Sequence, residues 1–364
     1  MSKGRTKSLK ARRDAALREA MEAALDHPDD DVRDRIERIE AYDRLLAAAP
    51  KQRWRELAWA LAVAAICVSL LGASLSIRVP AARVVLEVTA GTSTLALVEP
   101  WQFNNSAAVQ SASLSLRELE ELELPPAVPV SEPLRKNVWA DFEGGRVAVT
   151  ALSFGAGSTL TFEAGPERRV DLYVRRGSLA GTLTLTGSQR LAAGEGASDP
   201  SIDVEADFPI PEIIGFRSGS RGVVPTQLRI VPKDPIELYD LRVSRLSFTR
   251  EIPSEPGGID FVSSIDEGRL TLSDTGRSVP LPKYEILSLR DVAGRVRRMS
   301  VGERINLVFE GEAAQVLVGP EGFQQDLTPT IAEYLYHNQR VVFLWSALAF
   351  TWGVLWSARR MLVV

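Results

Sequence analysis

The chain has 364 residues, of which 45% are hydrophobic, and this is ample material for a core. Its formal net charge of -4 argues against nucleic acid as a partner of the whole protein. The single cysteine, Cys67, excludes a disulfide framework and a thiolate metal cluster. Because His27 and His337 lie near the ends of the chain, a zinc hydrolase or a Ser-His-Asp triad in the long central region is also excluded.

Residues 1–56 are rich in charged side chains and are expected to form a helical cytoplasmic tail. A helical pattern runs from Leu17 to Leu25 and is broken at His27-Pro28, after which three aspartates open a second helix. The weak apolar stripe of this second helix has three interpretations: a solvated helix, a helix that binds a partner or a second copy of the chain, and a helix on a membrane surface.

Two apolar segments without charged side chains, Leu57–Ile77 and Val341–Ser357, bracket the rest of the chain. At the helical rise they reach roughly 31 and 25 Å, close to the hydrocarbon thickness of a bilayer. They predict two transmembrane helices, at residues 57–78 and 341–358. The first follows a long polar tail, so it is interpreted as a signal anchor and not as a cleaved signal peptide.

Basic residues flank both apolar segments on the side away from the central region. They are Lys51, Arg53 and Arg55 before the first, and Arg359 and Arg360 after the second. Positive charge marks the cytoplasmic side, so both termini, including residues 359–364, are expected in the cytoplasm. A composition rich in Ala and Arg and poor in Lys and Asn indicates a bacterial genome. The expected location is the bacterial inner membrane, with residues 80–326 periplasmic or extracellular.

Between the two apolar segments the hydrophobic period changes to two, which is typical of strands. Short alternating or β-branched runs, bounded by Gly, Pro, Asp or Ser, recur from Ala82 to Glu310. No helical segments separate these runs, which disfavours a parallel sheet. The pattern predicts a mainly β protein, with an antiparallel β-sandwich or jelly-roll-like extracytoplasmic domain between two transmembrane helices.

A Pro-rich run at 125–133 cannot belong to a central strand and is interpreted as a linker. It would separate a membrane-proximal β subdomain, 79–124, from the main β-rich domain, 134–326. Ser115 and Glu118 have the spacing of a capping box, which predicts a short helix before the linker.

The end of the central region carries a helix-start signal. Thr328-Pro329 places proline at a first helical position. A juxtamembrane helix over 327–340 is therefore expected, continuous with the second apolar segment because nothing breaks the pattern between them.

Two groups of side chains in the β region are of a type that can bind ligands: alternating carboxylates and two tryptophans. Asp203, Glu205 and Asp207 alternate along a predicted strand and would share one face, a layout that suits Ca²⁺, although a solvated acidic strand is the simpler interpretation. Trp101 and Trp139 are expected in the core or at a subdomain contact. No nucleotide-binding or hydrolase motif occurs, and no cofactor or catalytic residue is expected.

Small residues recur along both apolar segments. They are Ala65, Ser69 and Ala73 in the first, and Ser346, Ala349 and Gly353 in the second. In lipid, small residues let helix backbones approach closely, so these stripes predict packing of the two spans against each other or against other copies. The alternative is that alanine is simply abundant in this composition.

These features favour a non-enzymatic two-span membrane protein whose extracytoplasmic β-domain binds a protein or glycan partner, as an envelope scaffold, assembly subunit or sensor. Besides the lipid bilayer, a second copy of the chain could associate through the spans and the N-terminal helix. One alternative is a histidine-independent envelope polysaccharide enzyme that uses carboxylates. Another is an oligomerising membrane effector, although spans without a polar stripe disfavour a conducting pore.

Overall fold

The computed structural model describes residues 3–26, 33–48, 77–103, 109–128, 132–196, 200–220, 224–254, 258–320 and 322–339, with separate positions between 62 and 76 and between 342 and 356. The chain divides into two compact units. The first comprises residues 1–73 and 341–364, and the second, which we call the β-unit, comprises residues 74–340.

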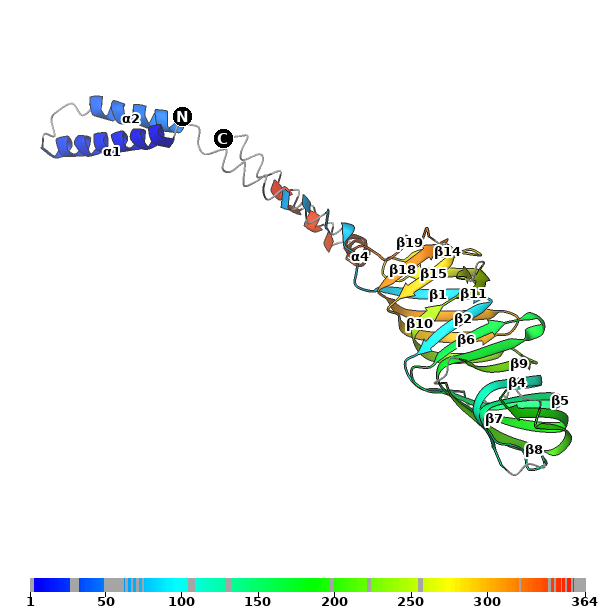
Figure 1. The fold of residues 1–364 in the computed structure, drawn as a ribbon. Helices are drawn as coiled ribbons and strands as arrows, with labels where there is room; N and C mark the ends of the chain where they lie inside the picture. Colours follow the sequence, from blue (N-terminus) through cyan, green and yellow to red (C-terminus); the bar gives the residue numbers. More distant parts are fainter. Residues whose placement is uncertain are drawn as a thin grey trace. The chain divides into compact units, whose positions relative to one another are not determined.

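The first unit includes the helices α1 (Lys3–Asp26) and α2 (Arg33–Ala48), and separate helical positions are described between 62 and 73 and between 342 and 356. Helices α1 and α2 lie side by side, and the guanidinium of Arg13 is 3.4 Å from the carboxylate of Asp43 (Figure 1). Helix α1 ends next to His27-Pro28, where the sequence predicts a break. Apolar side chains of α1, among them Met21, remain exposed.

The structure does not support the two expected transmembrane helices. Within the described residues, none of the helices combines the length and the apolar character that a membrane crossing requires. Much of Leu57–Ile77 and Val341–Ser357, including Cys67, lies outside the described residues. The spans at 57–78 and 341–358 therefore stay a prediction from sequence.

The β-unit confirms the predicted mainly β, antiparallel, sandwich-like fold. Where the chain is described, it forms one 17-stranded sheet and a separate two-stranded sheet, and the pairings between strands are antiparallel. The strands are β1 (Ala82–Ala90), β2 (Thr92–Leu97), β3 (Trp101–Phe103), β4 (Val109–Leu122), β5 (Leu134–Phe154), β6 (Thr159–Ala164), β7 (Val170–Glu195), β8 (Ile202–Ser220), β9 (Thr226–Pro232), β10 (Ile236–Ser247), β11 (Thr249–Ser254), β12 (Gly258–Ser263), β13 (Ile265–Leu272), β14 (Arg277–Leu281), β15 (Ile286–Arg290), β16 (Ala293–Val301), β17 (Ile305–Ala313), β18 (Gln315–Gly319) and β19 (Gln325–Asp326).

The strands gather in two groups along the β-unit, with β1, β10 and β13 to β19 at one end and β4, β5, β7 and β8 at the other (Figure 1). Strand β7 changes partners along its length: its first residues pair with β6 and β9, and its remainder pairs with β5 and β8. Gly177, at a φ of +100°, lies at the change of partners, and a Cβ there would be 2.2 Å from Ser158 Oγ. One buried cluster, which includes Leu86, Phe142 and Phe309, fills both groups.

Strand pairing corrects the helix predicted at Ser115 and Glu118, and it gives the surroundings of the Pro-rich run. Ser115 and Glu118 lie within β4 and not in a helix, because Leu114 and Leu116 alternate into the core, and the Ser115 hydroxyl donates to Asp141 at 2.6 Å. The Pro-rich run at 125–133 joins β4 to β5, which are hydrogen-bonded to each other, inside the single compact unit 74–340.

The chain enters and leaves the β-unit at one place, which we call the terminal clasp (residues 77–79 with 326–331). The amide of Val79 donates to the carbonyl of Pro329 at 2.9 Å, and that of Ile331 donates to Ile77 at 2.9 Å. Arg78 Nε also lies 3.2 Å from the Asp326 carboxylate. The two ends of the β-unit are thus held side by side by backbone and charge.

Helix α4 (Ile331–Asn338) follows the clasp directly. Thr330 and Glu333 form a capping box, so the helix begins after Thr330 and not at Pro329 as expected, because the threonine hydroxyl satisfies the free amide of Glu333. The helix ends at Asn338, since Gln339 takes a non-helical conformation. The expected continuous helix into the second apolar segment is therefore interrupted.

The clasp predicts a pH-dependent contribution to stability. Burial alone would raise the pKa of Asp326, but hydrogen bonds from Thr328 and Gln315 and the charge of Arg78 hold it below the ordinary value of 3.8. This contribution is complete above the unfolded pKa and is lost as pH falls through the folded pKa. Asp326→Asn should cost about 1 kcal/mol of unfolding free energy at pH 7, and the difference from wild type should shrink as pH falls below 3.8 through the lowered pKa of the folded carboxyl. Urea denaturation of both proteins across this range measures it, and a difference independent of pH would contradict it.

Candidate functional site

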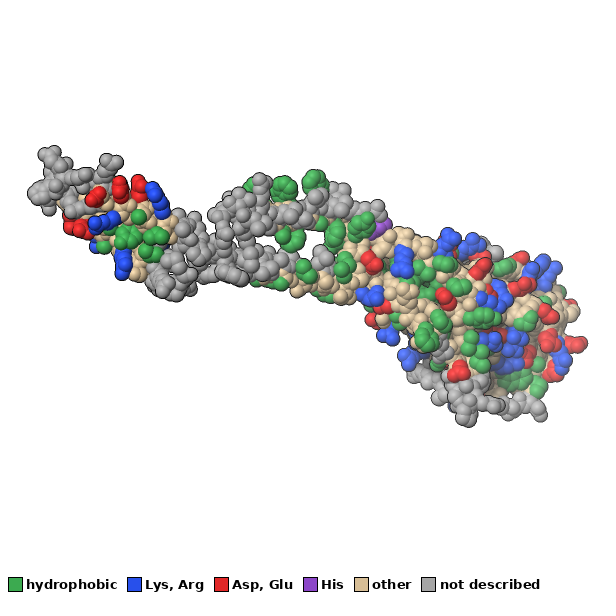
Figure 2. Space-filling model, turned by 90° about the horizontal axis from the view of Figure 1, so that it is seen from above, with side chains coloured by type: hydrophobic (Ala, Val, Ile, Leu, Met, Phe, Trp, Pro, Cys, Tyr) green, Lys and Arg blue, Asp and Glu red, His purple; other side chains and the backbone are tan. Residues whose placement is uncertain are grey.

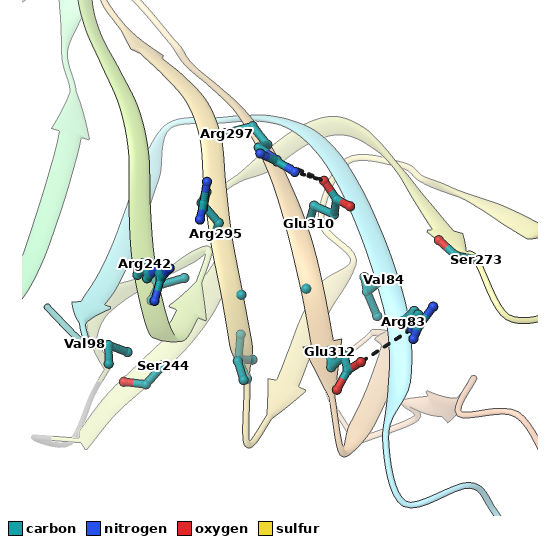
Figure 3. A pocket seen from close by; sticks show the side chains of 15 residues that line it. Arg83, Val84, Val98, Arg242, Ser244, Ser273, Arg295, Arg297, Glu310 and Glu312 are labelled. Carbon is teal, nitrogen blue, oxygen red and sulfur yellow. Dashed lines mark hydrogen bonds and ion pairs between the residues drawn. The ribbon is translucent and has the colours of Figure 1, made fainter.

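A groove of about 800 Å³ lies over four adjacent strands of the β-unit, in the order β10, β16, β17 and β1 (Figure 3). We call it the arginine groove. Its charged lining residues are Arg83, Arg242, Arg295, Arg297, Glu310 and Glu312, and Ser244 and Ser273 add hydroxyls. Four guanidinium groups against two carboxylates leave an excess of two positive charges in the lining.

Strand periodicity directs these charges outward. On β1, Arg83 alternates with the buried Val84, and on β10, Arg242 lies between the buried Leu241 and Val243. Successive side chains of a strand point to opposite faces, so the apolar residues fill the core while the arginines line the surface. The groove is therefore built on strands anchored by the core.

Two glycines form part of the groove floor. Gly294 on β16 and Gly311 on β17 are cross-strand neighbours. A Cβ on either would lie 2.6 Å from the ring of Phe309, which is buried. With glycine at both positions, the buried ring packs against bare backbone beneath these two strands.

Each arginine of the groove has a carboxylate partner. Arg297 lies 2.8 Å from Glu310, and Arg83 lies 3.5 Å from Glu312 (Figure 3). The partners of the other two are outside the lining: Arg242 pairs with Glu99 at 2.9 Å, and Arg295 pairs with Asp240 at 3.4 Å. On the face seen in Figure 2, charges of both signs are intermixed over the β-unit, so the excess in the groove is local.

A second, smaller cavity of about 330 Å³ lies beside Asp266. The Asp266 carboxylate is 3.0 Å from Arg304 Nε and 4.0 Å from Lys283 Nζ. Charges of both signs line this cavity in near balance. The arginine groove, which is larger and has the clearer charge excess, is the better candidate site.

A buried polar network crosses the middle of the sheet. The Asp171 carboxylate accepts from Arg229 at 2.6 Å and from Gln227 at 3.0 Å, and it also lies 3.2 Å from Arg169. Burial, followed by the charge of Asp171, raises the pKa of the Tyr173 phenol. Strand register places five side chains in one row across this region: Glu163, Asp171, Arg229, Ser115 and Asp141. The polar groups around Asp171 satisfy one another, which fits a structural role in holding β7 and β9 together.

The acidic side chains predicted as a possible Ca²⁺ site lie on β8, where two of them have partners within the sheet. Arg190 donates to both Asp203 oxygens, at 3.0 and 2.9 Å, and these bonds hold the pKa of Asp203 below its usual value. Ser188 donates to Asp207 at 3.2 Å, and Glu205 lies opposite Arg190 in the strand register. In the described part of the chain, no cluster of His, Cys, Asp and Glu is arranged to hold a metal ion.

The small-residue stripes lie in the first unit. The residues concerned are Ala65, Ser69, Ala73, Ser346, Ala349 and Gly353, and among them Ala73 is partly buried while the others are exposed. The Ser69 hydroxyl donates to the carbonyl of Ala65, one turn earlier, at 2.8 Å. A Cβ on Gly353 would meet nothing within 4 Å. Packing through these stripes stays a prediction.

The two tryptophans of the β-unit have different environments. Trp101 packs against the core, as expected, and stacks on Phe154 at 6.0 Å between ring centroids. Trp139 is half-buried over Gly194, with the Arg117 guanidinium 5.4 Å from its ring centroid. It belongs to the outer polar surface and not to the core, because strand alternation sends Val138 and Ala140 inward instead.

Compared with protein-family models, curated proteins and solved structures, the chain shows no match. Sequence reasoning missed the arginine groove, because its arginines are spread from Arg83 to Arg297. The local signal was the outward position of these arginines on their strands, as for Arg242 between the buried Leu241 and Val243, and such positions are common on strands.

The groove floor makes a stability prediction. Gly311→Ala places a Cβ 2.6 Å from both Phe309 and the Ala293 carbonyl, so it should lower the unfolding free energy by about 1–3 kcal/mol. Gly302→Ala is the matched control, because its Cβ would meet Pro235 at an ordinary 3.6 Å. Urea denaturation followed by circular dichroism compares the two. Equal stabilities would show that Phe309 can move aside without cost.

Proposed function

We propose that this chain is a non-enzymatic membrane-anchored protein whose β-unit binds a partner molecule in the arginine groove. The role is that of a scaffold, assembly subunit or sensor in a bacterial envelope. The observation that carries the proposal is the local excess of guanidinium groups, presented by β1, β10 and β16 above a buried core. Binding sites that must hold their geometry are best built on strands and helices fixed by packing.

Anchoring by two spans, 57–78 and 341–358, is part of the proposal. Its support is the apolar, uncharged character of both segments together with the terminal clasp. The clasp holds Ile77, at the end of the first apolar segment, next to Ile331, which precedes the second segment in the chain. This arrangement suits two crossings that return both termini to the cytoplasm, with the β-unit outside.

A binding role fits the carboxylates of the groove better than hydrolysis does. Glu310 and Glu312 are each ion-paired with an arginine. In glycoside hydrolases, by contrast, two carboxyl groups flank the bond that is cleaved, and one acts as the acid while the other acts as the base or the nucleophile. In the described residues, no specific observation favours the enzyme or the oligomerising effector.

The binding proposal is tested by photo-crosslinking in the cells that make the protein. A benzophenone side chain at Ser244, in the groove, should give a crosslinked product in the full-length chain. The same group at Gln102, an exposed residue of β3 outside the groove, is the control. Adding Arg242→Glu should abolish the Ser244 product. Equal products at both positions, or a product insensitive to Arg242→Glu, would contradict binding in the groove.

The topology is tested separately by reporter fusions. Alkaline phosphatase, which is active only outside the cytoplasm, should be active when fused after Gly187 in the β-unit. The same enzyme fused after residue 364 should be inactive, because the basic residues after the second span favour a cytoplasmic end. The reverse pattern would overturn the topology.

A further inference from the structure

Two arginines of the groove are directly opposed. Arg242 on β10 is the cross-strand partner of Arg295 on β16. Figure 3 shows both side chains on these neighbouring strands. Directly opposed residues of an antiparallel pair have Cβ atoms only ~5 Å apart, and like charges at such positions repel. The register thus places two arginines directly opposite each other, where pairing energy alone would favour opposite charges.

Each of these two arginines forms an ion pair with a carboxylate that lies outside the groove lining. Glu99 follows β2, and Asp240 lies two residues before Arg242 on its own strand; neither lines the groove. The Arg242 side chain is 54% exposed and that of Arg295 is 38% exposed. Within the lining, the nearest strand neighbour of opposite charge is Glu310, which is already bound by Arg297. The groove side of the arginine pair is open to a further anion.

We propose that this arginine pair binds a carboxylate of an acidic glycan, one that contains uronic acid units. This inference rests on the proposed function, since it names the class of partner that the same groove takes. Guanidinium groups are planar and donate two parallel hydrogen bonds, which matches the two oxygens of a carboxylate. An anion between Arg242 and Arg295 turns their repulsion into two attractive contacts.

The rest of the lining favours a glycan over an acidic peptide. Apolar side chains in the lining are limited to Val84, Val98, Val243, Val292 and Ala293. Protein partners usually bind through aromatic or large apolar side chains that are buried in the interface. The lining of this groove contains no large apolar or aromatic residue that could pack around such a side chain. Glu310, Glu312 and Ser244 instead offer acceptors and a donor for sugar hydroxyls. From β16 to β1 the groove crosses two strand spacings, about 10 Å, which is enough for more than one sugar ring.

The test is calorimetric titration of the full chain in detergent micelles with tetragalacturonic acid and with its fully methyl-esterified form. The acid should bind, and the ester, which has the same backbone without charge, should bind at least 10-fold more weakly. Arg242→Ala and Arg295→Ala should each weaken binding of the acid about 10-fold. Arg298→Ala is the matched control: it removes the same charge from β16, but Arg298 pairs with Glu237 outside the groove.

Arg295→Gln separates a binding role from a structural one. It removes both the like-charged neighbour of Arg242 and the exposed ion pair with Asp240. Such a surface pair contributes little to stability, so the melting temperature should change little although affinity for the acid is lost. A lowered melting temperature that accompanies the loss would overturn the proposal, as would equal binding of acid and ester. Tight binding of an octaglutamate peptide would overturn the glycan assignment. If neither sugar binds while the Ser244 crosslink persists, only this inference fails; if the crosslink is also absent, the proposed function fails with it.

Discussion

Strand β1 sets the arrangement of the β-unit, because a buried strand must have its backbone groups hydrogen-bonded on both edges. Residues 82–90 obtain these bonds from β13 on one side and β17 on the other, and both partners lie far along the chain, at residues 265–272 and 305–313. Pairing with β17 also brings the start of the unit next to its end. The terminal clasp, in which Arg78 contacts Asp326 and Thr330, therefore follows from the backbone hydrogen bonds that β1 makes with β17.

The arginine groove depends on the same pairing. Its lining comes mainly from β10, β16, β17 and β1, and the pairing of β1 with β17 is what brings Arg83 to the side of the groove. A surface ion pair is worth about 0–1 kcal/mol, whereas burying a Leu or Phe side chain contributes about 1.5–3 kcal/mol. Leu86, Val296 and Phe309 lie beneath these strands, so the core can hold an unfavourable pair such as Arg242 and Arg295 in place.

Sequence periodicity predicted the mainly β fold and the faces of the strands, as with Val84 inward and Arg83 outward on β1. It could not predict neighbours, because a period of two defines a face and not a partner. The capping-box spacing at Ser115 was misleading, since the same residues occur on an outward strand face where Asp141 accepts the hydroxyl. The Pro-rich run resembled a boundary because proline is excluded from central strands, although it lies between two paired ones. The groove required the register of four strands, which no local pattern contains.

Strand β1, which lines one side of the groove, follows shortly after the clasp residues 77–79. Arg83 lines the groove five residues after Arg78, and Glu312, its ion-pair partner, lies on the strand that leads through β18 and β19 to Asp326. A molecule bound across β10, β16, β17 and β1 would therefore contact strands that run directly to both ends of the β-unit. Antiparallel pairing of β1 with β17 over residues 82–90 links these two strands by a continuous ladder of backbone hydrogen bonds and not by loops. The proposed binding surface is thus connected through the paired strands β1 and β17 to the point where the chain enters and leaves the β-unit.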